Sequence, residues 1–186
     1  PTWQRLLIGR YIEENNLDIL RICVLDTDIL INNLSPNIFK ESNLNKISVV
    51  HLHRNLPYSL SDYKLRERLV YLRRFFLDKT YPLRSSITAN PNEIYKNYKL
   101  NNSTSDYFCA GVMVYDVKKN YKLFSKIYEK YCSKVNKKKF RGVEIPLNYE
   151  LTQKNKKLYW LDYKFQTNWL YELAAKYSFL YRINKN

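Results

Sequence analysis

The sequence predicts a mixed α/β fold in which helices flank a sheet. Short apolar runs, bounded by charged or turn-forming residues, recur along the chain, and longer segments with apolar residues every three or four positions lie between them. The short runs are typical of buried strands and the longer segments of amphipathic helices, and their alternation indicates α/β layers. The chain has 186 residues, 45% of them apolar, which is enough for a domain with its own core. We expect one domain over residues 1–186.

Four apolar runs are expected to form strands. The runs are Ile22–Leu25, Lys46–His51, Phe108–Tyr115 and Leu158–Leu161. Another apolar stretch, Ile29–Ile31, follows the first run closely, and the Asn-Asn-Leu-Ser-Pro sequence after it predicts a turn.

Five segments have the apolar spacing of helices. They are Thr2–Glu14, Ser61–Asp78, Lys118–Val135, Glu144–Gln153 and Thr167–Tyr177. Thr2 is a candidate cap of the first helix. The stretch from Lys79 to Asp106 contains repeated Asn together with Pro82 and Pro91, and we expect it to be a loop.

The charge of the chain favours anionic partners without identifying one. Lysine and arginine number 32 against 17 acidic residues, which gives a formal net charge of +15. Nucleic acids, phosphorylated ligands and membrane surfaces all attract such a chain. The lysines are spread singly among Asn and Tyr, so the charge alone is weak evidence. Three widely separated glycines exclude a glycine-rich phosphate loop, and no apolar run approaches the roughly 18 to 20 residues that cross a bilayer.

The cysteines predict a reducing compartment. Cys23, Cys109 and Cys132 form no C-x-x-C pair, so neither a zinc knuckle nor a thioredoxin-type site is expected. Cys23 and Cys132 lie among apolar residues and are expected to be buried free thiols, which favours the cytoplasm. The sequence begins with Pro-Thr-Trp and has no signal-peptide pattern, and we expect it to be part of a longer chain.

Asp26 and Asp28 are the strongest candidates for chemistry. They directly follow the apolar run Ile22–Leu25, which would place both at the carboxyl end of a strand, where open α/β sheets bind ligands. Two carboxylates in this position can hold Mg²⁺ or Mn²⁺ and leave coordination positions for substrate phosphates. Their apolar neighbours would make them costly unless water or a cation neutralises them.

Three classes of protein use such a pair of aspartates. Phosphatases of the haloacid-dehalogenase type need a small hydroxyl or Gly-Thr turn directly afterwards, where this chain has Ile29 and Leu30. Nucleases of the PIN type begin with an apolar strand and Asp-Thr, which Leu25-Asp26-Thr27-Asp28 resembles, but the later acidic helix of that class is not found. Glycosyltransferases of the GT-A fold use the pair to bind the metal–diphosphate of a nucleotide sugar.

The surrounding sequence resembles glycosyltransferase family 8, the galactosyltransferase and glycogenin-like group. The first part of the resemblance is an early Arg-Leu helix followed by a strand that ends in Asp-x-Asp. The second is a "Y-F-N-A-G-V" strand, and the third a "D-Q-D-h-L-N" segment with a later Asn. The matching stretches are Trp3–Ile12, Val24–Ile31, Asp106–Asp116, Val143–Asn148 and Trp160–Asn168.

The resemblance implies a fold and an activity. The fold would be a GT-A-like (Rossmann-like) mixed sheet flanked by helices. The activity would be that of a hexosyltransferase that takes a sugar from a UDP-type donor with retention of configuration, with Mn²⁺ (or Mg²⁺) as cofactor. The acceptor would be a glycan, a lipid-linked molecule or a protein.

The resemblance also implies roles for single residues. Asp26 and Asp28 would hold the metal ion, and Thr27 between them would belong to the donor site. Arg5 would reach the sugar–diphosphate part of the donor, because a planar guanidinium suits such an anion.

Two further positions complete the implied site. Ala110 and Gly111 would contact the donor sugar, which can approach the backbone where side chains are small or missing. Glu144 would be the catalytic residue beside the reacting carbon of the sugar, as a nucleophile or as a charge that stabilises an oxocarbenium-like centre.

The chain departs from the family pattern at several points. Cys109 stands where the family usually has Asn, and Val143 and Ile145 replace both acids of the third motif. The family's late metal-binding His has no counterpart before Asn186. We expect the chain to be either a fragment of a longer domain, lacking part of the N-terminal nucleotide-binding half, or a degenerate or shortened member of the family.

Two other features complete the sequence-based expectations. His51 and His53 would share one face of a strand, and we expect them on its surface. The basic run Lys134–Arg141 is either a solvated loop or a site that attracts an anionic acceptor or membrane surface. A PIN-like nuclease and a basic nucleic-acid-binding module are the alternative functions. We do not expect nucleic acid as a partner, because no RNA-binding signature is present.

Overall fold

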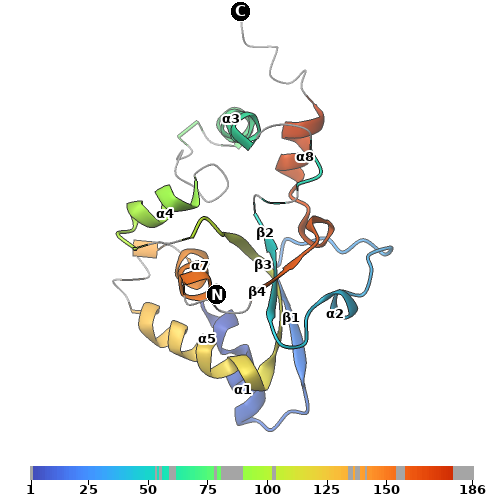
Figure 1. Ribbon diagram of the computed structural model, residues 1–186, viewed down its shortest axis with the longest axis vertical. Helices are drawn as coiled ribbons and strands as arrows, with labels where there is room; N and C mark the ends of the chain where they lie inside the picture. Colours follow the sequence, from blue (N-terminus) through green and yellow to red (C-terminus); the bar gives the residue numbers. More distant parts are fainter. Residues whose placement is uncertain are drawn as a thin grey trace, which may run out of the picture.

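The computed structural model describes residues 2–52, 54, 56–58, 62–77, 79–80, 90–101, 104–133, 136, 139–140, 142–153 and 158–177. This part of the chain has a mixed α/β fold with a four-stranded sheet, as predicted (Figure 1). The strands are β1 (Arg21–Leu25), β2 (Ile47–His51), β3 (Phe108–Asp116) and β4 (Leu158–Leu161). The helical elements are η1 (Gln4–Leu7), α1 (Ile8–Glu14), α2 (Ile38–Glu41), α3 (Asp62–Leu72), the π-helical turn η2 (Arg73–Leu77), α4 (Pro91–Asn97), α5 (Val117–Tyr131), α7 (Glu144–Gln153), η3 (Tyr163–Gln166) and α8 (Trp169–Lys176).

The sheet is mixed, and its strand order is β1-β3-β2-β4. Strand β3 runs antiparallel to both β1 and β2, whereas β2 and β4 are parallel. Strands β1, β2 and β4 therefore run in the same direction, and their carboxyl ends lie at one edge of the sheet. We call this edge the carboxyl edge. Residues that follow these strands are brought together there although they are distant in the sequence.

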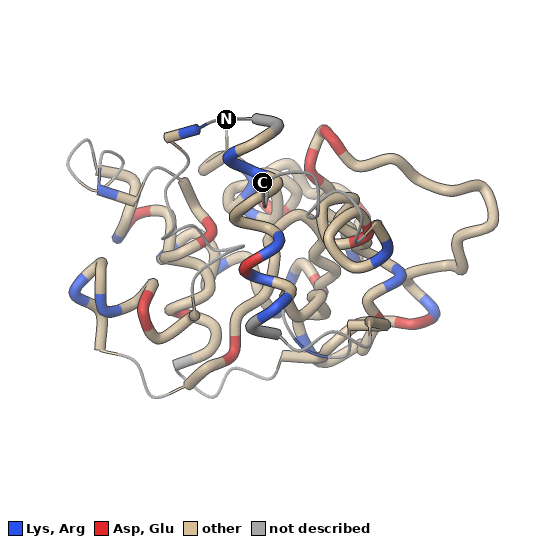
Figure 2. Tube along the Cα trace, turned by 90° about the horizontal axis from the view of Figure 1, so that it is seen from above, with Lys and Arg blue, Asp and Glu red and all other residues tan. Residues whose placement is uncertain are grey.

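Charged residues of both signs are interspersed along the described part of the chain. Figure 2 shows Lys and Arg on several elements, with Asp and Glu between them. Among the described residues, the positive charge is therefore not gathered on one helix or strand. Of the basic run Lys134–Arg141, only Lys139 is a described basic residue, and its Nζ lies 4.9 Å from the centre of the Phe140 ring. The remaining basic residues of this run lie outside the described residues.

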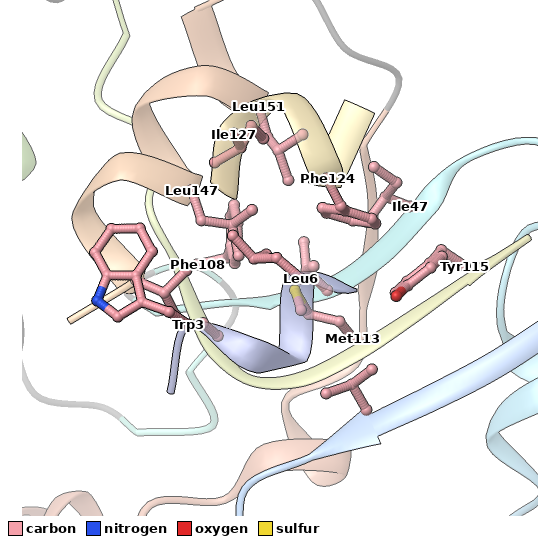
Figure 3. Packing of buried hydrophobic residues seen from close by; sticks show 14 of the residues in the cluster. Trp3, Leu6, Ile47, Phe108, Met113, Tyr115, Phe124, Ile127, Leu147 and Leu151 are labelled. Carbon is pink, nitrogen blue, oxygen red and sulfur yellow. The ribbon is translucent and has the colours of Figure 1, made fainter. Parts of the chain in front are cut away.

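The main core lies between one face of the sheet and the helices α1, α5 and α7, which Figure 1 shows on the same side of the strands. Trp3 and Leu6 from the N-terminal turn pack there with Phe124 of α5, Leu147 of α7 and Met113 of β3 (Figure 3). The apolar stripe predicted for the helix after β3 is thus the face that it buries. The helix ends at Tyr131, short of the predicted Val135.

Helix α1 can lie against α5 because residue 9 is a glycine. A Cβ atom on Gly9 would lie 3.0 Å from Cβ of Tyr121 in α5, closer than two side-chain carbons normally approach. The close contact of the two helices fixes the N-terminal turn, and with it the position of Arg5.

A second core forms beyond the sheet. Leu65, Leu69 and Leu72 of α3 are buried together with Leu170 and Ala174 of α8. Figure 1 shows α3 and α8 beside each other at the end of the molecule opposite α1. No described helix is long and apolar enough to cross a membrane.

The opposite face of the sheet carries a smaller apolar cluster. Neighbouring residues on a strand point to opposite faces, so Val112 faces away from the core that contains Met113. The members of the small cluster are Val50, Val112 and Leu161 with the partly buried Ile29, Ile38 and Phe165.

The prediction of a loop over Lys79–Asp106 is wrong for residues 91–97, which form α4. The Asn90 side chain caps this helix by accepting a hydrogen bond of 3.0 Å from the backbone N–H of Asn92. Pro91 takes the first helical position, where its missing N–H costs nothing. Residues 81–89 and 102–103 lie outside the described residues. The expected cap at Thr2 is also wrong, because Trp3 is the N-cap residue and no side chain bonds there.

The expectation that His51 lies on the surface is wrong. Its side chain is only 6% exposed, because β2 is an inner strand and both of its faces are covered. The ring packs edge-on against Trp160, with centroids 4.8 Å apart, and Nδ1 accepts a hydrogen bond of 2.9 Å from the backbone N–H of Arg54. Burial, aided by the charge of Arg54, lowers the pKa of His51 to about 4. His53 lies outside the described residues.

The cysteines are free, as predicted, but Cys23 and Cys132 are only partly buried. Burial raises the pKa of the Cys23 thiol. The expectation that both thiols are buried therefore holds only in part, because β1 is an edge strand of the sheet and Cys132 follows the last turn of α5.

Candidate functional site

Asp26 and Asp28 lie in a turn directly after β1, at the carboxyl edge. The backbone N–H of Asp26 donates a hydrogen bond of 2.9 Å to the carbonyl of Gly111, which extends the ladder between β1 and β3 by one residue. The turn closes where the N–H of Ile29 donates to the carbonyl of Asp26 at 3.3 Å. Thr27 and Asp28 are exposed, whereas Asp26 is partly buried.

Arg5 joins the ends of β1 and β3. Its Nη2 atom forms an ion pair with Asp26 Oδ1, and its Nη1 atom donates a hydrogen bond of 2.9 Å to the carbonyl of Ala110. The arginine is held in place by its neighbour Leu6, which is fully buried in the main core. The structure thus gives Asp26 a cation as partner, in the form of a guanidinium group. Asp26 therefore does not need a metal ion to offset the cost of its partial burial.

Gly111 is a point of close approach rather than a flexible hinge. A Cβ atom on this residue would overlap Nε2 of Gln166 and would lie 3.1 Å from Oδ2 of Asp26. The missing side chain therefore lets a carboxylate and an amide approach the same stretch of backbone. Gln166 Nε2 also donates a hydrogen bond of 2.8 Å to Sγ of Cys109.

A pocket opens beside this group of residues, on the face of the sheet that carries the small apolar cluster. Its volume is about 480 Å³, which is within the usual range for small-molecule sites. Polar groups in its lining follow two strands. Asp28 lies in the turn after β1, and Lys164 and Gln166 lie in η3, which follows β4. Its apolar wall includes Leu25, Ile29, Ile31, Phe165 and Trp169.

Glu144 is the first residue of α7 and is not among the residues that line this pocket. Its Oε1 atom accepts a hydrogen bond of 3.0 Å from the hydroxyl of Tyr107. Asn148, one turn later, is fully buried and bonds to the backbone N–H and carbonyl of Phe108 at 2.7 and 2.8 Å, which ties α7 to the start of β3. The position of Glu144 relative to β3 is therefore fixed by the last residue of the same motif.

Cys109 is hydrogen-bonded to Gln166 of the pocket and is close enough to Glu144 to be affected by its charge. Burial, reinforced by the negative charge of Glu144, raises the pKa of the Cys109 thiol to about 12. The same carboxylate, together with burial, raises the pKa of Tyr107 well above its ordinary value. Both groups are therefore protonated at neutral pH, and Cys109 is a hydrogen-bonding group rather than a nucleophile.

The two aspartates suit a metal ion only in combination with a ligand. In the described part of the chain, no group of three or more His, Cys, Asp or Glu side chains is placed to hold a metal ion. One oxygen of Asp26 is already bound by Arg5. The remaining oxygen of Asp26 and the exposed carboxylate of Asp28 can supply two ligands, and Mg²⁺ and Mn²⁺ commonly take the others from phosphates and water.

The structure thus brings together most residues that the sequence singled out. Arg5, Asp26, Ala110 and Gly111 are in direct contact, and Asp28 lines the adjoining pocket. Glu144 is not in the lining of that pocket, but its charge acts on Cys109, which is hydrogen-bonded to Gln166.

Sequence reasoning missed three residues that line the pocket, namely Lys164, Gln166 and Trp169. They follow β4, whose carboxyl end shares an edge with that of β1. The rule that selected Asp26 and Asp28 would have selected this segment too, had the direction of the strand at 158–161 been known.

Comparison of the chain with protein-family models, with curated proteins and with solved structures finds no match in any of the three.

Proposed function

We propose that the chain is a glycosyltransferase domain of the GT-A type. It binds a UDP-type nucleotide sugar together with Mn²⁺ or Mg²⁺ and transfers the sugar, with retention of configuration, to a glycan, lipid-linked or protein acceptor. The observation that carries the proposal is the contact among Arg5, Asp26, Ala110 and Gly111 at the carboxyl edge of the sheet. Three separate parts of the sequence resemble a nucleotide-sugar site, and two of them meet at this point while the third lies next to it.

The charges of the site suit a diphosphate. Arg5 lies at the base of the site with its guanidinium shared between a carboxylate and a carbonyl, so it orients Asp26 and leaves Oδ2 of that residue toward Gly111. Asp26 and Asp28 would hold the divalent ion. When bound, such an ion neutralises the charge that develops on the departing nucleoside diphosphate.

The sugar would lie near Ala110 and Gly111, which are buried beside the pocket, with the Gln166 amide next to Gly111. Glu144 contributes a negative charge close to the strand, which adds to the effect of burial in raising the pKa of Cys109. A fixed negative charge at this position stabilises positive charge at the reacting carbon of the sugar. Its hydrogen bond from Tyr107 holds the carboxylate in place.

A melting experiment tests the proposal. Ligands that bind the folded state raise its melting temperature, and two ligands that bind together raise it more than the sum of their separate effects. We expect this synergy for Mn²⁺ and UDP with the wild-type protein, and we expect Asp28→Asn to abolish it. Asp18→Asn is the matched control, because Asp18 is an exposed acid in the segment before β1. If the melting temperature of the wild-type protein does not respond to Mn²⁺ and UDP together, the proposal is wrong.

The same protein can be tested for the nuclease alternative. A nuclease that uses Asp26 and Asp28 would degrade RNA or DNA when Mn²⁺ is added, and Asp28→Asn would stop it. A nucleic-acid-binding module would retain tight binding near physiological salt, whereas nonspecific attraction to a charge of +15 falls steeply as salt rises. Either result without a response to UDP would replace our proposal.

A further inference from the structure

Gln166 brings an unused hydrogen-bond acceptor to the candidate site. Its amide nitrogen donates to Cys109, but its Oε1 atom is buried and no donor among the described residues reaches it. Buried polar atoms in folded proteins are nearly always paired, so a buried acceptor without a partner needs an explanation. Gln166 also lines the pocket that contains Asp28, which makes a ligand the natural partner.

The backbone around Gln166 is built for close approach. Gly111 faces the Gln166 amide, and any side chain at position 111 would displace that amide. The hydrogen bond that Nε2 donates to Sγ of Cys109 orients the amide and leaves Oε1 on the other side. The acceptor is therefore held in position before any ligand arrives.

The chemistry of this acceptor selects the part of the ligand that it can bind. A carbonyl oxygen repels phosphate and attracts an O–H or N–H donor. Lys164, in the same pocket, is the group that suits a phosphate, and the exposed Trp169 offers an aromatic face on which the apolar side of a sugar ring can pack. A nucleotide sugar satisfies all three features, and a hydroxyl group of its sugar is the part that can donate to Oε1 of Gln166.

We propose that Gln166 is a specificity-determining residue that accepts a hydrogen bond from a hydroxyl group of the donor sugar. This inference rests on the proposed function, because it names the part of the UDP-sugar that Gln166 recognises. The residue takes no part in binding UDP itself. Its loss therefore weakens the binding of UDP-sugars and leaves the binding of UDP unchanged.

The test compares UDP with UDP-glucose and UDP-galactose by calorimetric titration in the presence of Mn²⁺. Gln166→Met removes the amide and keeps the length of the side chain. One neutral hydrogen bond corresponds to roughly threefold to tenfold in affinity. We expect a loss of this size for at least one UDP-sugar and a change of less than about twofold for UDP. Gln4→Met is the control, because Gln4 is an exposed glutamine next to Arg5.

Analogues of the preferred UDP-sugar with one hydroxyl replaced by fluorine give a second readout on the wild type. Fluorine cannot donate a hydrogen bond, so one analogue should bind the wild type more weakly by the same factor and should lose nothing further in Gln166→Met. This arm remains informative on the wild type alone if the variant fails to fold.

The outcomes separate the two proposals. Equal losses for UDP and UDP-sugar, or no loss for either, would overturn the role of Gln166 and leave nucleotide binding in place. Equal affinity of the wild type for every fluorinated analogue would also overturn it. A wild-type protein that binds neither UDP nor UDP-sugars would instead remove the proposed function, and this inference with it.

Discussion

Gly111→Ala should separate binding from stability, because the atoms nearest to a methyl group at this position belong to the candidate site. The added Cβ would overlap Nε2 of Gln166 and lie 3.1 Å from Oδ2 of Asp26. The first of these atoms is the end of a flexible side chain and can rotate away. The second is held by the ion pair with Arg5 and can yield only by a few tenths of an ångström.

The expected cost in stability is small. Rotation of Gln166 breaks its hydrogen bond to Cys109, which costs about 0.5–1.5 kcal/mol. Replacing a glycine inside a strand by alanine returns about 0.5–1 kcal/mol, because the unfolded chain loses less freedom. The two effects nearly cancel, and we expect the free energy of unfolding to change by less than about 1 kcal/mol. The methyl group nevertheless displaces the Gln166 amide and crowds Asp26, and affinity for a UDP-sugar with Mn²⁺ should fall by about tenfold, since overpacking typically costs about 1–3 kcal/mol.

The assay is urea unfolding together with calorimetric titration of the ligand. Gly142→Ala is the matched control, because a Cβ atom there meets nothing within 4 Å. In the Gly111→Ala background, Gln166→Ala should cost about 0.5–1.5 kcal/mol less than in the wild type, since the hydrogen bond to Cys109 is already broken. Unchanged ligand affinity in Gly111→Ala, or purely additive stability effects in the double variant, would refute the described arrangement of Gly111 and Gln166.

Two further predictions concern His51 and Glu144. The folded-state pKa of His51 is about 4, below the ordinary 6.5, so between these values the unfolded chain binds more protons and acidification favours unfolding. From pH 7 to pH 5 the free energy of unfolding should fall by about 2 kcal/mol more in the wild type than in His51→Asn, as measured by urea unfolding; equal slopes would contradict the buried, neutral histidine. Glu144→Gln keeps an acceptor for the Tyr107 hydroxyl and removes the charge, so stability and UDP affinity should stay near wild type while sugar transfer slows by about 100-fold. Glu144→Ala should in addition lose about 1–3 kcal/mol of stability, because it leaves the buried Tyr107 hydroxyl without this acceptor. A normal rate of sugar transfer in Glu144→Gln would remove this residue from the site.

The sequence predicted strands and amphipathic helices well because local patterns determine them. The ranges of β1 to β4 agree with the predicted strands within one residue, and α7 begins and ends where its apolar spacing does. The sequence does not predict α4, because its start, Asn90-Pro91, has the composition of a loop although it is also a capping signal. The exposure of His51 could not be predicted locally, since it depends on β2 being an inner strand between β3 and β4.

The candidate site was predicted in part, and for a physical reason. Apolar strands followed by carboxylates can be recognised in sequence, and this selected Asp26 and Asp28. Gln166 has no such pattern, because a neutral amide in a short 3₁₀ turn gives no local signal of function. Its role becomes visible only when strand directions place the ends of β1 and β4 at the same edge. The pairing of Arg5 with Asp26 likewise depends on the packing of the N-terminal turn.

The central claim is that this site binds a nucleoside diphosphate through a divalent ion, and a paired titration tests it most directly. UDP and UMP are titrated calorimetrically into the wild-type protein with Mn²⁺ and again with EDTA. Asp26 and Asp28 supply too few ligands to hold the ion without a diphosphate, so we predict that UDP binds at least about tenfold more tightly than UMP with Mn²⁺ and that EDTA removes this preference. Equal binding of UDP and UMP, or no binding of either with Mn²⁺ present, would contradict the account.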